Sequence, residues 1–117
     1  MDTVVEIEAG SSGRLFVSHI ANSLLEGFNV YGARPTGAKE IRAKILAGEM
    51  GAGRVFLPKQ MKGRGDFLAE FRSFPDSAND DAVDATSQGV IHYLQKVGRL
   101  DKVDDEKVGL YVEKVSK

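Results

Sequence analysis

The sequence predicts an α/β fold with a short, mainly parallel sheet and flanking helices. Short β-rich runs alternate along the chain with longer segments of helical periodicity, an order typical of parallel sheets joined by crossover helices. The first run, TVVEIEA (residues 3–9), begins with apolar side chains on both faces, as strands do when helices cover both sides of a parallel sheet. With 117 residues, the chain forms one domain or part of one.

The expected elements alternate in type and end at glycine or proline. In order, they are a strand at 3–9, a helix at 13–27, a strand at 28–35, a helix at 37–51, an extended run at 54–58 and one or two helical turns at 65–74. The GSSG sequence stops the first strand, Gly27 stops the first helix and Pro35 ends the second strand.

Apolar stripes predict which face of each helix packs on the core. In the first helix the stripe is Leu15, Phe16, Ile20, Leu24 and Leu25, and in the second it is Ile41, Ile45 and Leu46. A further helix follows NDDAVDATSQG (79–89), and its stripe is Val83, Ser87, Val90, Ile91, Leu94 and Val97. We therefore expect a domain at 1–98, followed by a polar tail at 99–117 whose weak periodicity indicates at most a terminal helix.

Composition excludes several classes of protein. The chain has no cysteine, so it has neither disulfides nor thiolate metal sites. It has no run of roughly 20 apolar residues that would cross a membrane, and MDTVVEIE does not resemble a signal peptide. No phosphate-binding loop motif is present, which excludes an ATPase motor of that class. We expect a cytoplasmic protein.

The formal net charge of −1 hides a strong asymmetry along the chain. Residues 34–72 carry nine basic and four acidic side chains, whereas residues 73–106 carry eight acidic and three basic ones. A basic middle next to an acidic cluster suits a polyanion held beside a bound cation, although ordinary solvated helix faces also produce such blocks. The glycine-containing loop KQMKGRG (59–65) could grip phosphates or simply keep a loop hydrated.

Three aspartates, Asp80, Asp81 and Asp84, crowd the predicted start of the last helix. Acidic residues there complement the helix macrodipole, and Asn79 is a suitable N-cap. That explanation fits Asp84 poorly, because it lies one turn further into the helix. Clustered carboxylates repel one another, and a divalent cation would relieve the repulsion. Oxygen ligands without cysteine indicate Mg²⁺ or Mn²⁺.

Glu6 and Glu8 share one face of the first strand, and Glu8 lies at its carboxyl end. Ligands of open α/β sheets bind outside the carboxyl ends of the strands. A strand end that simply faces solvent is the alternative.

Four segments in this order resemble the carboxyl-terminal nuclease domain of the large terminase subunit of tailed bacteriophages and prophages. They are VVEIEAGSSG, AKEIRAKILAGEMGAGRVFLP, DFLAEFRSFP and NDDAVDATSQGVIHYL. The family has a strand that ends in a catalytic glutamate, a K-E-x-R helix leading to G-x-V-x-x-P, an acidic-aromatic helix ending in F-P, and D-D-x-V-D-A at a helix start. The resemblance covers roughly residues 4–94.

The resemblance implies a truncated RNase H-like fold and a metal-dependent endonuclease that cuts concatemeric phage DNA during packaging, in a bacterial host cell. Glu8, Asp81 and Asp84 fall on the family's catalytic positions, and Asp80 lies beside them as a further ligand for one or two Mg²⁺ or Mn²⁺ ions. Double-stranded DNA would lie along the basic segment and make few base contacts. The candidate DNA-binding residues are Arg34, Lys39, Arg42, Lys59, Lys62 and Arg64.

The sequence departs from the family pattern in ways that bear on activity. Asn79 stands where the family often has histidine, Gly37 and Ala38 stand where it often has serine, and the strand with the leading catalytic aspartate and the ATPase domain are absent. We therefore expect weak cleavage or none from the isolated chain. The first strand would then be an open edge that could pair with the remainder of a terminase or with another copy. The alternative function is a catalytically silent interaction module that uses this edge.

Overall fold

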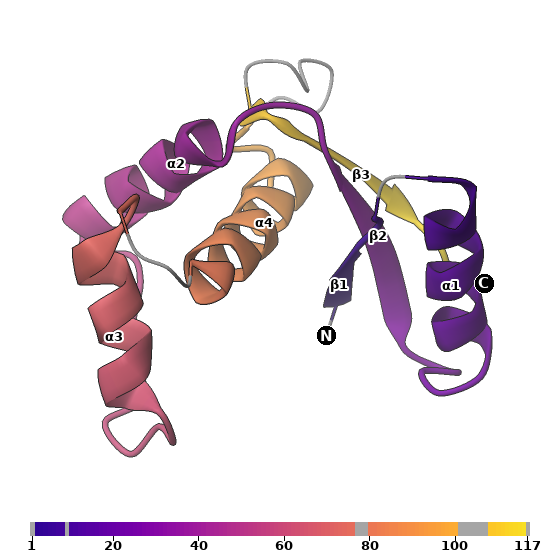
Figure 1. The fold of residues 1–117 in the computed structure, drawn as a ribbon, viewed down its shortest axis with the longest axis horizontal. Coiled ribbons are helices and arrows are strands. Elements are labelled where there is room, and N and C mark those ends of the chain that lie inside the picture. The colour runs from indigo at the N-terminus through magenta and orange to yellow at the C-terminus, as the bar shows by residue number, and fades with distance from the viewer. Residues whose placement is uncertain (1, 9, 77–79, 101–107, 117) are drawn as a thin grey trace.

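Three strands and four helices form a small α/β domain in the computed structural model, which describes residues 2–8, 10–76, 80–100 and 108–116 (Figure 1). In chain order they are β1 (Asp2–Glu6), α1 (Ser11–Asn22), β2 (Asn29–Pro35), α2 (Lys39–Gly51), α3 (Arg64–Ser73), α4 (Asp81–Lys96) and β3 (Leu110–Lys114). The α/β class predicted from the sequence is therefore confirmed.

The sheet has the strand order β1-β2-β3, with β2 in the centre. β1 and β2 are parallel, with Val5 opposite Gly32, whereas β2 and β3 are antiparallel, with Ala33 opposite Val112. The sheet is thus mixed, and the expectation of a mainly parallel sheet is wrong.

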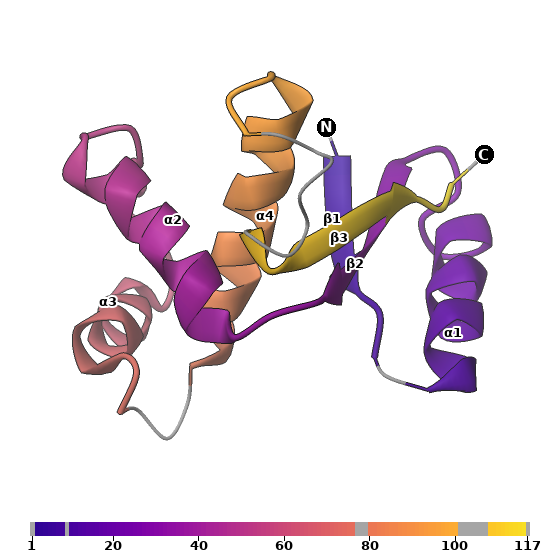
Figure 2. The same ribbon diagram turned by 90° about the horizontal axis from the view of Figure 1, so that it is seen from above.

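Helices cover both faces of this sheet. Figures 1 and 2 show α1 on one side of it and α4 on the other, with α2 and α3 beyond α4. The core lies between the sheet and α4, where period-two alternation brings side chains of β2 and β3 onto one face. It is formed by Ala33, Ile91, Val108 and Leu110, with Val4, Ile45, Leu100 and Val112 packed around them.

The stripe predicted for α4 packs largely as expected, because Val83, Ser87, Ile91 and Leu94 are buried. The stripe predicted for the first helix is wrong. Leu15, Phe16 and Leu24 are 73%, 64% and 79% exposed.

A different side of α1 faces the sheet, where Val17 and Ala21 are buried one helical turn apart. Among the described elements α1 packs mainly on β2, so only a narrow stripe of the helix is covered.

The C-terminal expectation also needs correction. Residues 110–114 were expected in a polar, weakly helical tail but form β3. Gly109 turns the chain with a φ of 69°, after which Leu110 and Val112 alternate onto the core face. The extended run expected at 54–58 belongs to no strand.

α1 begins in close contact with the chain that leaves β1. An added Cβ at Gly13 would clash with the backbone carbonyl of Glu8, whereas one at Gly48 in α2 would meet no atom within 4 Å. We therefore expect Gly13→Ala to lower the free energy of unfolding by about 1–3 kcal/mol, the usual cost of overpacking. Gly48→Ala should raise it by about 0.5–1 kcal/mol, because glycine weakens a helix interior.

Urea unfolding of the two variants measures this difference. If Gly13→Ala stabilised the protein as Gly48→Ala does, α1 would not start against Glu8.

Candidate functional site

Two of the three clustered aspartates have cationic partners on α2. Lys39 donates a hydrogen bond to Asp80, and Arg42 forms an ion pair with Asp84 at 2.9 Å. Lys39 and Arg42 are three residues apart on α2, and Asp80 and Asp84 are four apart at the start of α4. Because both spacings correspond to about one helical turn, the packed helices align the pairs. The hydrogen bond to Asp80 raises the pKa of Lys39.

Arg42 is buried, with an exposed fraction of 3%. Its Nε and Nη2 lie 2.9 Å from the same oxygen of Asp84, Oδ1. Its Nη1 donates to the carbonyl oxygens of Gly37 at 2.9 Å and Gly109 at 3.0 Å. A single guanidinium thus joins the β2–α2 loop, α2, α4 and the residue before β3, so it is not available to DNA phosphates. This burial counts against the expected contact of Arg42 with DNA.

The start of α4 is capped from α3. The backbone N–H of Ala82 donates to Oε1 of Glu70 at 3.1 Å, so a carboxylate on another helix satisfies one of the free N–H groups of the first turn. Asp80 holds the N-cap position but makes no side-chain cap hydrogen bond. Asn79, expected as the N-cap, lies outside the described residues.

The start of α4 and the end of β1 share a cavity of about 270 Å³. It is lined by Val4, Glu6, Asp81, Asp84, Ala85 and Gln88. Nε2 of Gln88 donates to Oε1 of Glu6 at 2.7 Å and lies 3.3 Å from Oδ2 of Asp84. One amide therefore bridges carboxylates of two elements, and Glu6 is 82 residues from Gln88 in sequence. We name this group, Glu6, Asp81, Asp84 and Gln88, the acidic site.

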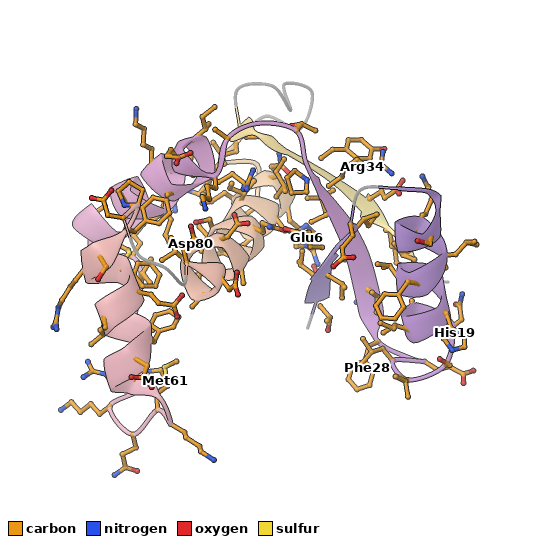
Figure 3. All side chains as sticks on the ribbon, in the orientation of Figure 1. Glu6, His19, Phe28, Arg34, Met61 and Asp80 are labelled. Atoms are coloured by element: carbon orange, nitrogen blue, oxygen red, sulfur yellow. The ribbon has the colours of Figure 1, made fainter. Side chains whose placement is uncertain are left out.

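Two carboxylates of the acidic site lack a cationic partner. Within the described residues, the carboxylate of Asp81 forms no hydrogen bond or ion pair. Among the same residues, the carboxylate of Glu6 accepts a hydrogen bond from the amide of Gln88 alone. Figure 3 shows Glu6 on β1 and Asp80 by α4, farther from the sheet toward α2 and α3.

Glu8 does not line this cavity. β1 ends at Glu6, and Glu8 lines a second cavity of about 510 Å³ together with Glu6, Ile7, Gly10, Arg34 and Pro35. The sequence predicts that Asp81 and Asp84 lie together, and they line the same cavity. It predicts Glu8 as their partner on the strand, whereas Glu6 is the glutamate that lines this cavity. Alternation places both glutamates on the face of Val4, so it does not distinguish them; the difference is that β1 ends at Glu6.

The remaining basic candidates lie in different places. Lys39 is engaged with Asp80, and Arg34 is exposed beside Glu6 and Glu8. Lys59, Lys62 and Arg64 are exposed around the start of α3. Figure 3 shows Met61, in the same loop, at the end of α3 away from Asp80. These three residues are therefore remote from the acidic site.

The acidic site suits a hard cation by its donor chemistry. Its candidate ligand atoms are the carboxylate oxygens of Glu6, Asp81 and Asp84, which Mg²⁺ and Mn²⁺ prefer. No ready-made group of three or more His, Asp or Glu side chains that could hold a metal ion occurs in the part of the chain that the structure describes. Mg²⁺ commonly binds through one or two carboxylates and completes its shell with water and substrate phosphates. Glu6 and Asp84, joined by one amide, fit that mode.

A second polar cluster fixes β1 to α4. Oδ2 of Asp2 lies 2.7 Å from Nζ of Lys96 and 2.9 Å from Nε2 of His92. The ring of His92 packs on Tyr31, with 4.3 Å between centroids. Hydrogen bonds from Lys96 first and His92 second lower the pKa of Asp2 from its usual 3.8 to about 2. Because Glu6 lies on the same strand, this anchor also sets its position over α4.

Comparisons with known proteins give no relative. No family model, curated protein or solved structure matches this chain. In the described parts of the chain, none of the helices combines the length and the apolar character that crossing a membrane requires.

The anchor predicts an acid-sensitive contribution to stability. The folded pKa of Asp2, about 2, lies below its usual value of 3.8, so the stabilisation is present above about pH 4 and disappears as the pH falls through about 2. We expect Asp2→Asn to be less stable than wild type at pH 7, and the difference to vanish near pH 2.

Urea midpoints measured across this pH range provide the test. Glu8→Gln removes an exposed carboxylate without an ion pair among the described residues, so it controls for the change in net charge. A constant difference between wild type and Asp2→Asn at every pH would show that Asp2 is not ion-paired in the folded protein.

Proposed function

We propose that this chain is a metal-dependent nuclease domain of the terminase type, which hydrolyses phosphodiester bonds of double-stranded DNA with Mg²⁺ or Mn²⁺. The observation that carries the proposal is the convergence of Glu6 from β1 with Asp81 and Asp84 from α4 on one cavity. The ordered motifs in the sequence, which resemble the terminase nuclease family, support the same activity. An RNase H-like fold is part of this proposal.

Glu6 and Asp84 would hold the cation, and Asp81 would ligate it directly or through water. The bound ion would lower the pKa of a water nucleophile and stabilise the charge on the scissile phosphate. Arg42 takes one oxygen of Asp84, Oδ1, and thereby leaves the other, Oδ2, on the side of Gln88 and the cavity. Gln88 fixes the spacing between Glu6 and Asp84 in the absence of the ion.

The DNA backbone would approach from the side of the second cavity. Arg34 is exposed there, next to Glu6, and has no ion-pair partner within the described residues. A guanidinium suits a phosphate because it donates two parallel hydrogen bonds. Contacts of this kind position the duplex without reading its sequence, so cleavage would show little sequence preference.

The acidic site provides a matched pair of variants, because Glu6 lines the cavity of Asp84 and Glu8 does not. We expect Glu6→Gln to weaken Mn²⁺ binding by about tenfold, as expected for the loss of one charged ligand. Glu8→Gln should leave the affinity within about twofold. Titration of Mn²⁺ followed by NMR line broadening measures both affinities and locates the ion.

Plasmid nicking with Mn²⁺ tests the reaction itself. We expect slow, metal-dependent nicking that is lost in Asp84→Asn and retained in Glu8→Gln. Nicking that survives in Asp84→Asn would refute the site. Mn²⁺ broadening spread evenly over exposed carboxylates, with no effect of Glu6→Gln, would refute the metal.

A second candidate function is a catalytically silent interaction module. The observation that favours it is the position of β1 at the edge of the sheet, where an exposed strand can accept another. Light scattering with and without Mg²⁺ and DNA separates the two candidates. An assembly indifferent to both additions favours the interaction module.

A further inference from the structure

β1 exposes backbone hydrogen-bonding groups along its outer edge. The N–H of Ile7 donates to the carbonyl oxygen of Ala33 on β2 at 2.7 Å. Successive residues of a strand direct their backbone groups to opposite sides, so those of Val4 and Glu6 point away from β2. No other strand of the described chain pairs with that edge. These groups are therefore available to an added strand.

A groove accompanies this edge along α4. The cavity of the acidic site shares Val4 and Ala85 with a cavity of about 750 Å³. The larger cavity extends from Asp2 and Val4 past Ala85 and Gly89 to Tyr93 and Val97. Two residues of α4 that line the groove, Ala85 and Gly89, are small. A Cβ added at Gly89 would meet no atom within 4 Å. The side chains of an added strand would have room there.

The apolar surface beside this groove is uncovered. Tyr93 on α4 is 59% exposed and Val97, directly after α4, is 48% exposed, and both line the larger cavity. Burying such surface favours association. An open backbone edge, a groove with small walls and an exposed apolar flank thus occur together.

Charge distinguishes between possible occupants. Asp2 already forms an ion pair with Lys96, but Glu6 has no cationic partner within the described residues. Antiparallel pairing of β1 with the β1 of a second copy, centred on Val4, would place Glu6 opposite Asp2. That carboxylate would leave Glu6 without a cation, whereas opposite charges in a cross-strand pair are favourable, so a strand that carries a basic residue opposite Glu6 fits better than a second copy.

We propose that β1 and the adjacent flank of α4 form a binding groove for an extended peptide strand of another protein. The strand carries Lys or Arg opposite Glu6, and a small or β-branched apolar residue opposite Val4, above Ala85 and Gly89. Its backbone pairs with Val4 and Glu6, which supplies affinity, and the alternate side chains supply specificity. The inference rests on the second candidate function, for which it names the partner, and does not require the nuclease activity proposed above.

A designed peptide tests this directly in the presence of EDTA, so that no metal contributes. The probe is a capped, fluorescein-labelled Thr-Lys-Thr-Val-Thr-Lys-Thr, which places lysine opposite Glu6 in either strand direction. Fluorescence anisotropy gives its affinity. The peptide with both lysines replaced by glutamate should bind severalfold more weakly, because the favourable cross-strand pair with Glu6 becomes repulsive. Glu6→Lys should reduce this preference for lysine over glutamate.

A matched pair of glycine variants separates an effect on the groove from an effect on folding. Gly89→Leu fills the groove and should weaken binding of the lysine peptide at least about tenfold, as expected when an interface pocket is blocked. Gly48→Leu makes the same change at an exposed position of α2 with equally open space and should leave binding unchanged. Thermal unfolding confirms that both variants remain folded.

Hydrogen exchange locates the peptide. We expect the Val4 and Glu6 amides to exchange more slowly when the lysine peptide is bound. Equal binding of the two peptides, or binding unaffected by Gly89→Leu, overturns the proposal. So does a dimer of the free protein whose Val4 and Glu6 amides are already protected.

Discussion

The buried guanidinium of Arg42 is the interaction on which the rest of the structure depends. A buried charge is costly unless it is paired and fully hydrogen-bonded, and Arg42 meets both conditions through Asp84 and the carbonyls of Gly37 and Gly109. Those partners come from three segments far apart in the chain. Arg42 therefore fixes where α4 lies against α2 and where β3 begins, and the sheet and the acidic site follow from that arrangement.

This arrangement changes how the acidic cluster is understood. Crowded aspartates at a helix start suggest that an external cation is needed, but Asp80 and Asp84 already have protein cations. The support for a metal comes instead from Glu6 and Asp81, which have none within the described residues. Glu6 also belongs to the open edge of β1, so a bound cation and a basic residue of an added strand would compete for the same carboxylate.

Much of the fold follows from local sequence pattern, whereas the site depends on distant contacts. The stripe of α4 and the α/β class were predictable because periodicity is a local property. The choice between Glu6 and Glu8 depended on where β1 ends, and that is set by pairing with β2. The strand at Leu110–Lys114 was missed because its partner is remote in sequence, and the burial of Arg42 was missed because charged residues are buried only when tertiary partners meet them.

A double-mutant cycle on Arg42 and Asp84 measures the central interaction most directly. The free energies of unfolding of Arg42→Met, Asp84→Ala and the double variant give the coupling between the two side chains. The buried pair predicts a coupling of about 1–3 kcal/mol. The exposed pair of Lys39 and Asp80, treated in the same way, should show a smaller one. Additive effects of the two substitutions, with a coupling below about 0.5 kcal/mol, would contradict the role assigned to Arg42.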